Sequence, residues 1–257
     1  MTDEYRGLSV LITGGGSGIG AATARLLARR GARVAIMGRT PSTIEAVADE
    51  IVEANGIAIA IPGDVSVLED VERAVRATVE QFGRLDAVVA NAAIQLHKRD
   101  RPIHEAEVSA WDDTMHTNLR GTFLTCRTAI KQMLEQGDGG AVVVISSVTA
   151  LVGIAAQNPA YTATKGGLLS FGRALAVQYG PDNIRVNVVC PGAMSEPPDV
   201  ENLGDPAVRE NRIVPQIPLG RLGRFDELAP MVAFLCGPES TYATGGVFTI
   251  DGGMTAR

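Results

Sequence analysis

Short apolar runs alternate with longer stretches in which apolar residues recur every three or four positions. The runs, rich in Val, Ile and Ala, predict strands at Leu8–Thr13, Arg33–Met37, Ile57–Ile61, Ala87–Ala90, Ala141–Ile145, Ile184–Val189 and Val247–Ile250. The stretches predict helices over Gly18–Gly31, from Pro41 to Gly56, from an N-cap at Ser66 to Phe82, over Trp111–Glu135 with a break near Asn118, over Ala160–Tyr179 and over Asp226–Leu235. This alternation predicts a single α/β domain over residues 1–257, a Rossmann-type doubly wound sheet of about seven parallel strands with helices on both faces.

Two irregular segments, Gln95–Glu105 and Ala193–Arg224, directly follow predicted strands. Ligands of open α/β sheets bind outside the carboxyl ends of the strands, so we expect both segments to border a site. Segment 193–224 mixes prolines with apolar residues and is expected to form a cap over a mostly apolar substrate pocket.

Composition narrows the class of partner. The 257 residues are 46% hydrophobic, which is enough for a sizeable core, and carry a net charge of −6, which disfavours nucleic acid. No apolar run approaches the roughly 18 residues that cross a bilayer, and the acidic N-terminus shows no secretory signal. We therefore expect a cytoplasmic protein that binds neither nucleic acid nor membrane.

The cysteines and histidines do not have the spacing of a metal site. Cys126, Cys190 and Cys236 are widely separated, and we expect each to be a small buried residue in a reducing compartment. The histidines, His97, His104 and His116, lack the spacing of a closed zinc site. No metal is expected.

The run Thr13-Gly-Gly-Gly-Ser-Gly-Ile-Gly20 lies between the first strand and the first helix. Glycines let the backbone approach a pyrophosphate closely, and the N–H groups at a helix start can bind its charge. The alternative is a glycine-rich turn without a ligand. The run therefore predicts a dinucleotide site.

The end of the second strand bears on which dinucleotide binds. An acidic residue there would bind the ribose 2′-hydroxyl of NAD, but the chain reads Met37-Gly-Arg-Thr40. Arg39 could pair with the 2′-phosphate of NADP, which favours NADP(H) over NAD(H). The alternative is a solvated surface arginine.

Tyr161 and Lys165 lie four residues apart at the start of a predicted helix, on one face. A free tyrosine has a pKa near 10, and a nearby ammonium, helped by the positive charge of an oxidised nicotinamide, would favour the phenolate. Taken alone, such a pair is more often a half-buried ring beside a surface charge. The surrounding motifs favour the catalytic interpretation.

Those motifs make the sequence resemble the short-chain dehydrogenases/reductases over essentially its whole length. The matching elements, in chain order, are Thr13–Gly20, Asp64-Val65, Asn91-Ala-Ala93, Asn118, Ser146-Ser147, Tyr161-x-x-x-Lys165, Pro191-Gly192, Pro218-Leu-Gly-Arg-Leu-Gly223 and Tyr242-Ala-Thr-Gly-Gly-Val-Phe-Thr-Ile-Asp-Gly-Gly253. Each could occur by chance, but their ordered combination is specific.

The resemblance implies a role for each matching residue. Tyr161 would be the general acid/base, Lys165 would lower its pKa and bind the nicotinamide ribose, Ser147 would polarise the substrate carbonyl, and Asn118 would hold a water in a proton relay. Cofactor contacts are implied for Gly14, Ser17, Gly18, Ile19, Gly20, Arg39, Asp64, Val65, Asn91, Ala92, Tyr161, Lys165, Pro191 and Gly192. Asp64 and Asn91 have alternatives, as a helix-capping carboxylate and a turn residue.

Three departures from the family pattern affect the site. Ala93 stands where Gly is common, which narrows the space near the cofactor. The stretch between the serines and Tyr161 is one residue longer than usual, so the choice of Ser147 over Ser146 depends on aligning Ser-Ser-Val-Thr-Ala. Glu196 occupies the position of a threonine that contacts the carboxamide, and Ser195 or a backbone group would have to replace that contact.

The sequence says less about the substrate and the oligomeric state than about the fold. Positive charge in His97–Arg101 could attract an anionic substrate, although a solvated loop with Asp100 and Glu105 as local partners is favoured. The expected function is hydride transfer between NADP(H) and a secondary alcohol or ketone. The alternatives are an NAD(H)-dependent dehydrogenase of the same family, a non-catalytic dinucleotide-binding protein and, less favoured, a sugar-nucleotide epimerase or dehydratase. The resemblance also implies a homo-oligomer, a tetramer or a dimer.

Overall fold

The Val- and Ile-rich runs form one seven-stranded sheet in the computed structural model, which describes residues 5–153, 158–194 and 211–256. All neighbouring strands pair in parallel, in the order β3-β2-β1-β4-β5-β6-β7. The strands are β1 (Ser9–Thr13), β2 (Arg33–Gly38), β3 (Ile57–Pro62), β4 (Ala87–Ala90), β5 (Gly140–Ile145), β6 (Ile184–Pro191) and β7 (Val247–Ile250). The predicted doubly wound sheet is confirmed.

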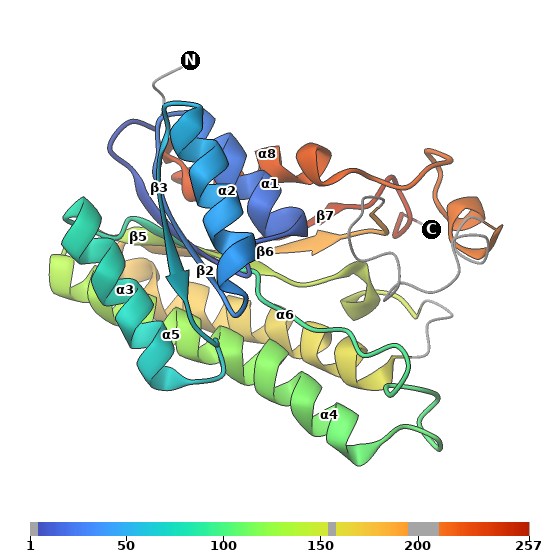
Figure 1. The fold of residues 1–257 in the computed structure, drawn as a ribbon. Coiled ribbons are helices and arrows are strands. Elements are labelled where there is room, and N and C mark those ends of the chain that lie inside the picture. Colours follow the sequence, from blue (N-terminus) through green and yellow to red (C-terminus); the bar gives the residue numbers. More distant parts are fainter. Residues whose placement is uncertain (1–4, 154–157, 195–210, 257) are drawn as a thin grey trace.

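Helices cover both faces of this sheet (Figure 1). One layer contains α1 (Gly18–Arg29), α2 (Pro41–Glu53) and α8 (Phe225–Cys236), and the other contains α3 (Leu68–Phe82), α4 (Val108–Thr114), α5 (Gly121–Gln136) and α6 (Pro159–Tyr179). Successive side chains of a strand point to opposite faces, so Val10 and Ile12 join the core under α1 and α8, whereas Leu11 joins the core under α5 and α6. Both cores require apolar strands, which explains their nearly continuous hydrophobic sequences.

The helix boundaries correct two predictions. Ser66 does not cap α3: Val67 occupies the N-cap position, and the Ser66 hydroxyl donates to Asp64 Oδ1 at 2.7 Å. Helix α2 ends at Glu53 rather than at Gly56, because Asn55 adopts a positive φ of 62° and turns the chain.

The break predicted near Asn118 is confirmed. In place of one helix over Trp111–Glu135, the chain forms α4, then a π-helix over Met115–Arg120, then α5. A π-helix inside an α-helical stretch often marks a functional site.

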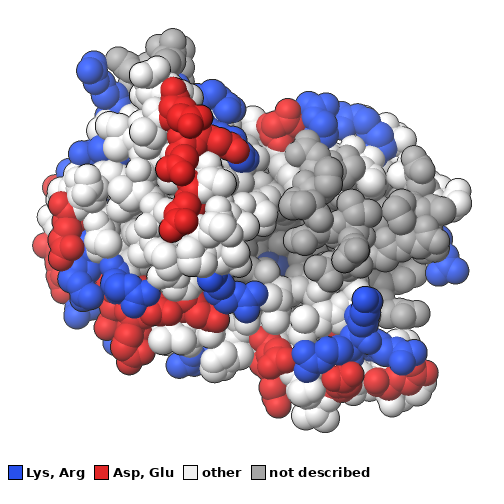
Figure 2. Space-filling view, viewed as in Figure 1, with Lys and Arg blue, Asp and Glu red and all other residues white. Residues whose placement is uncertain are grey.

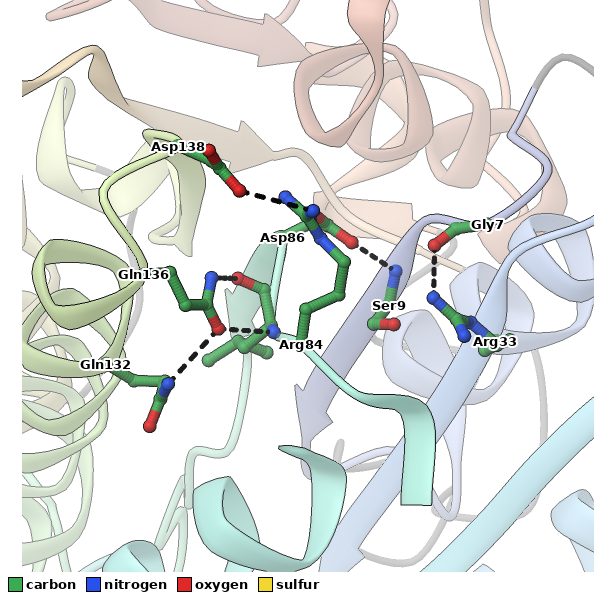
Figure 3. A network of polar contacts seen from close by, with 9 residues as sticks. Gly7, Ser9, Arg33, Arg84, Asp86, Gln132, Gln136 and Asp138 are labelled. Carbon is green, nitrogen blue, oxygen red and sulfur yellow. Dashed lines mark hydrogen bonds and ion pairs between the residues drawn. The ribbon is translucent and has the colours of Figure 1, made fainter. Parts of the chain in front are cut away.

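Polar contacts fix the amino ends of the central strands, at the edge opposite the predicted site (Figure 3). Asp86 precedes β4 and accepts from the Ser9 N–H of β1 at 2.8 Å, while Arg84 pairs with Asp86 at 2.5 Å and with Asp138 at 3.3 Å. Gln136 bonds both backbone groups of Leu85. This network fixes the spacing of β1 and β4 without contributing to the site.

The chain runs outward from β1 to β3 and then returns to the other side of β1 with β4. The connections after β1 and β4 therefore diverge, and the carboxyl ends of these strands form the crevice in which doubly wound sheets bind ligands. All three cysteines are free and buried, as predicted. None of the helices in the described ranges is long and apolar enough to span a membrane, and no three His, Cys, Asp or Glu side chains there are grouped to hold a metal ion.

Candidate active site

The glycine run forms a tight turn between β1 and α1. The Gly14 N–H donates to Met37 O at 2.8 Å, and both Gly14 and Gly18 have positive φ, 64° and 53°. A Cβ on Gly14 would lie 2.8 Å from Ala92 Cα, and one on Gly20 would lie 2.4 Å from Gly14 O. The backbone packing therefore requires glycine at both positions.

The start of α1 is open to an anion. Ser17 is exposed at the N-cap position, its side chain makes no capping hydrogen bond, and the first turn contains no acidic residue. The first N–H groups of a helix lack intrahelical partners and carry its positive dipole end, a donor set that fits a pyrophosphate. Ile19 and Gly20 lie in this same first turn.

Asn91 holds the glycine turn rather than pointing away from it. Its Nδ2 donates to Thr13 O and Gly14 O, each at 3.0 Å. In return, Thr13 Oγ1 accepts from the N–H groups of Asn91 and Ala92 at 3.1 and 3.2 Å. The carboxyl ends of β1 and β4 are thus hydrogen-bonded to each other. Sequence analysis placed Thr13 at the start of the glycine motif but assigned it no role of its own.

A cavity of about 500 Å³ lies at the ends of β2 and β4, where the adenosine half of a dinucleotide is expected. Its lining residues are Arg39, Ser66, Ile94, Leu96, Asp112, Asp113, His116 and Thr117. Arg39 is exposed and forms no ion pair with any described residue. Figure 2 shows this edge of the molecule hollowed between the two helical layers.

Asp64 and Val65 lie next to this cavity. Asp64 is half-buried and accepts from the Ser66 N–H and hydroxyl at 2.8 and 2.7 Å, so it closes the turn before α3 and does not cap the helix itself. Val65 is buried, and a Cβ on Gly121 would meet its side chain at 2.7 Å.

Ser147 and Tyr161 come together from two different elements. Ser147 follows β5, Tyr161 lies in the first turn of α6, and the Ser147 hydroxyl is near enough to the Tyr161 phenol to lower its pKa. Ser146 instead donates to Lys165 O at 2.8 Å and is buried. Of the two candidate serines, Ser147 is the one that contacts Tyr161.

Lys165 lies one turn beyond Tyr161 on the same face of α6. Its Nζ is 5.4 Å from the centre of the Tyr161 ring and donates to Ile145 O at 2.8 Å. Burial lowers the pKa of Lys165 to about 8 and raises the pKa of Tyr161 to about 12, although the nearby Ser147 hydroxyl acts to lower the Tyr161 pKa. In the protein without a dinucleotide, desolvation of the phenol is the largest influence on its pKa. The lowering expected with the added charge of an oxidised nicotinamide stays a prediction.

Asn118 is fully buried in the π-helix and faces the segment after β4. Its Oδ1 accepts from Ile94 N–H at 2.8 Å, and its Nδ2 donates to Ile94 O at 2.9 Å. Both ends of the side-chain amide thus hold Ile94 in place. The structure gives Asn118 the position of a support for the site.

Pro191 and Gly192 lie at the carboxyl end of β6. The Gly192 N–H donates to Ile250 O at 2.9 Å, and a Cβ on Gly192 would lie 2.6 Å from Asp251 Cα. Glu196 and Ser195 lie outside the described residues, as do Pro197, Pro198 and Pro206. Of the predicted cap, Ile217 packs in a small cluster with Met254 and with Val148, the neighbour of Ser147.

The charges of the His97–Arg101 segment are largely paired within their own neighbourhood. Arg99 pairs with Glu107 at 2.9 Å and with Asp113 at 3.0 Å, and Arg101 pairs with Glu105 at 2.9 Å. Figure 2 shows blue and red atoms interleaved at its lower right. The favoured interpretation holds for Glu105 but is wrong for Asp100, which is 1% exposed and bonds the start of α6. Sequence reasoning missed this contact, because nothing local distinguishes Asp100 from the charges around it.

Comparison with known proteins finds relatives of this chain by sequence and by structure. A family model described as enoyl-(acyl carrier protein) reductase matches residues 14–255. The L-rhamnose 1-dehydrogenase (NAD(P)(+)) of Azotobacter vinelandii is 40% identical over 96% of both chains, and the glucose 1-dehydrogenase of Gluconobacter oxydans is 35% identical over 98% of this chain and 94% of its own. A short-chain type dehydrogenase/reductase from Mycobacterium marinum superposes with a TM-score of 0.90 at 32% identity, over 99% of this chain and 98% of its own.

Proposed function

The chain belongs to the short-chain dehydrogenase/reductase family of NAD(P)-dependent oxidoreductases, and we propose that it transfers a hydride between NADP(H) and a secondary alcohol or ketone, with Tyr161 as general acid/base. The observation that carries the proposal is the position of the buried Lys165 amine, 5.4 Å from the centre of the Tyr161 ring, with the Ser147 hydroxyl near enough to the phenol to lower its pKa. The dinucleotide, when bound, supplies the hydride or accepts it.

Each catalytic side chain has a distinct task in this proposal. Burial keeps Tyr161 protonated near neutral pH, because its pKa is raised to about 12, and the protonated phenol can donate to a carbonyl oxygen. Ser147 orients that oxygen and donates to it. In the oxidising direction the phenol must lose its proton, which the nearby Ser147 hydroxyl and the positive charge of Lys165 favour.

Exchange of Tyr161 for phenylalanine tests the proposal. Tyr161→Phe is expected to keep the thermal stabilisation by NADPH and to lower turnover by about 10²- to 10⁴-fold, because only the proton donor is removed. Turnover comparable to that of the parent protein would rule out this role for Tyr161. A parent protein that binds NADPH but shows no turnover in a broad screen of alcohols would favour the non-catalytic alternative.

We propose NADP(H) over NAD(H) from the end of β2. Arg39 stands at the adenosine cavity without an ion pair to any described residue, and its guanidinium can bind a 2′-phosphate through two parallel hydrogen bonds. Arg39→Asp is expected to weaken NADPH binding far more than NADH binding, as measured by calorimetric titration. An unchanged preference would place the phosphate contact at another residue.

The substrate screen should begin with cyclic aldoses. Two relatives are named for rhamnose and glucose, and both names specify oxidation at carbon 1. That carbon carries a hydroxyl and a hydrogen, as a secondary alcohol does, so the same proton and hydride transfers apply. Formation of reduced dinucleotide from aldoses and simple secondary alcohols, with NADP and NAD in parallel, measures substrate and cofactor together.

A second copy of the chain is the proposed partner on the outer face of α5 and α6. Phe123 is 46% exposed and Val177 is 82% exposed, and a cavity of about 720 Å³ there is lined by Met115, Leu119, Phe123 and Phe171 with Asp112, His116 and Arg120. Apolar area of this kind is typical of an interface. Phe123→Glu is expected to reduce the particle mass measured by light scattering, and an unchanged mass would place the interface on another face.

The three buried, unpaired cysteines support a reducing, cytoplasmic location.

A further inference from the structure

Helix α6, which carries Tyr161 and Lys165, begins without a cap of its own. Asn158 occupies the N-cap position, but its side chain makes no capping hydrogen bond, and the first turn contains no acidic residue. Pro159 has no N–H group. The first N–H groups of the helix that need partners are therefore those of Ala160 and Tyr161.

Asp100 supplies both partners from a different part of the fold. Its Oδ1 accepts from Ala160 N–H at 3.1 Å, and its Oδ2 accepts from Tyr161 N–H at 3.0 Å. The carboxylate is 1% exposed, and it comes from the segment that follows β4. A negative charge at the positive end of a helix, with both oxygens hydrogen-bonded, is a strong and directional cap.

The backbone around Asp100 is anchored as well. Its N–H donates to Leu96 O at 2.7 Å, and its carbonyl accepts from Asn158 Nδ2 at 2.9 Å. Asn158 Oδ1 in turn accepts from Gln95 Nε2 at 3.1 Å. The asparagine that would ordinarily cap α6 thus uses its side chain to hold the segment whose carboxylate caps the helix.

Arg99, the residue before Asp100, binds the start of α4 instead of α6. Arg99 donates to Glu107, to Ser109 and to Asp113, all at or next to α4, between 2.9 and 3.0 Å. Consecutive residues of one loop therefore connect the starts of two helices. One of these helices continues into the π-helix that carries Asn118, and the other carries the reacting phenol.

We propose that Asp100 is a positioning residue that fixes the Tyr161 phenol against Ser147. Tyr161 lies in the first turn, where its N–H has no intrahelical acceptor, so Asp100 is the group that holds its backbone. Ser147 follows β5, and its hydroxyl stays near the phenol only if the start of α6 keeps its place. Misplacement of a reacting group by about 1 Å can cost about 10²-fold in rate. The importance of Asp100 for turnover rests on the proposed function.

The test compares Asp100→Asn with a matched variant far from the site. Asp86→Asn also weakens a carboxylate that accepts a backbone N–H from a distant segment, Ser9 at 2.8 Å, but at the opposite edge of the sheet (Figure 3). The full chain, saturated with NADPH, is labelled with ¹³C at the tyrosine ring carbon that bears oxygen. It contains four tyrosines, and Tyr161→Phe assigns the line of Tyr161.

Asp100→Asn is expected to shift or split the Tyr161 line, and Asp86→Asn to leave it in place. Asp100→Ala, which removes both acceptors, should show the larger change, and the asparagine variant still gives the answer if the alanine variant does not fold. With a substrate from the screen, kcat of Asp100→Asn is expected to fall about tenfold or more while the Kd for NADPH stays within about twofold.

A Tyr161 line in Asp100→Asn that coincides with that of the parent protein would overturn the proposal. So would a kcat equal to that of Asp86→Asn at equal loss of thermal stability, since a purely structural cap predicts that result. The resonance needs no turnover. If Tyr161→Phe retains full activity, the proposed function fails, and the ¹³C comparison still decides whether Asp100 positions Tyr161.

Discussion

Replacing Gly20 by alanine measures how tightly the glycine turn is closed. Gly20 lies inside α1, where alanine is favoured over glycine by about 1 kcal/mol in helix propensity. The added Cβ, however, would lie 2.4 Å from Gly14 O and 2.9 Å from Gly15 Cα. Both are backbone atoms that cannot rotate away, so the turn must move. Overpacking of this kind costs about 1–3 kcal/mol.

Gly166 provides the matched control. It lies inside α6, and a Cβ there would have nothing within 4 Å. Gly166→Ala therefore gains helix propensity without the clash, and most of the difference between the two variants comes from the clash. That difference of about 1–3 kcal/mol in the free energy of unfolding corresponds to about 2–12 °C in Tm for a domain of this size.

Thermal unfolding with and without NADPH is the assay. At about 100 times its Kd, NADPH should stabilise the parent protein and Gly166→Ala by about 2.7 kcal/mol. Gly20→Ala should lose most of this stabilisation, because the displaced Gly14 carbonyl also bonds Asn91. If Gly20→Ala unfolds at the temperature of Gly166→Ala and keeps the full NADPH shift, the turn is not closed as described and the reasoning fails.

Further predictions separate catalysis from stability. Ser147→Ala is expected to lower kcat by about 10²-fold with little change in Tm. Ser146→Ala should keep kcat but lose about 1–2 kcal/mol of stability, because its buried hydrogen bond to Lys165 O is removed. Steady-state kinetics and urea unfolding of both variants measure these effects, and the reverse pattern would exchange the roles of the two serines. Burial lowers the pKa of Lys165 from 10.5 to about 8, so the charged amine destabilises the fold at neutral pH and the penalty disappears as pH rises from about 8 to 10.5. Lys165→Met should therefore be more stable than the parent protein at pH 7, by on the order of 3 kcal/mol, and lose this advantage by pH 10.5. A constant difference across urea unfolding at several pH values would contradict the lowered pKa.

The sheet could be predicted from the sequence because its signals are local and repeated. A strand buried on both faces must be apolar throughout, and Val10, Leu11 and Ile12 meet that requirement for two different cores. The helix start at Ser66 was predicted wrongly for a competing local reason. Asp64 lies two residues earlier and takes the hydroxyl that would have capped α3.

The site was predictable only as far as its residues carry motifs. The spacing of Tyr161 and Lys165 put them on one helix face, and the structure keeps them there. The choice between Ser146 and Ser147 depends on the backbone conformation after β5. That conformation directs the Ser146 hydroxyl to Lys165 O and the Ser147 hydroxyl toward the Tyr161 phenol. The role of Asp100 at the start of α6 could not be predicted, because its partners are 60 and 61 residues away and no pattern in the sequence connects them.

The segment from Asn91 to Asp100 contacts three parts of the candidate site. At its start, Asn91 bonds the glycine turn through Thr13 O and Gly14 O. In its middle, Ile94 is held by both ends of the Asn118 amide, and at its end Asp100 holds the Tyr161 N–H. The glycine turn and the start of α6, to which the proposed function assigns dinucleotide binding and proton transfer, thus belong to one hydrogen-bonded unit. A shift of the glycine turn must be accommodated along this segment, so the geometry at Tyr161 depends on contacts that begin at the opposite end of the crevice.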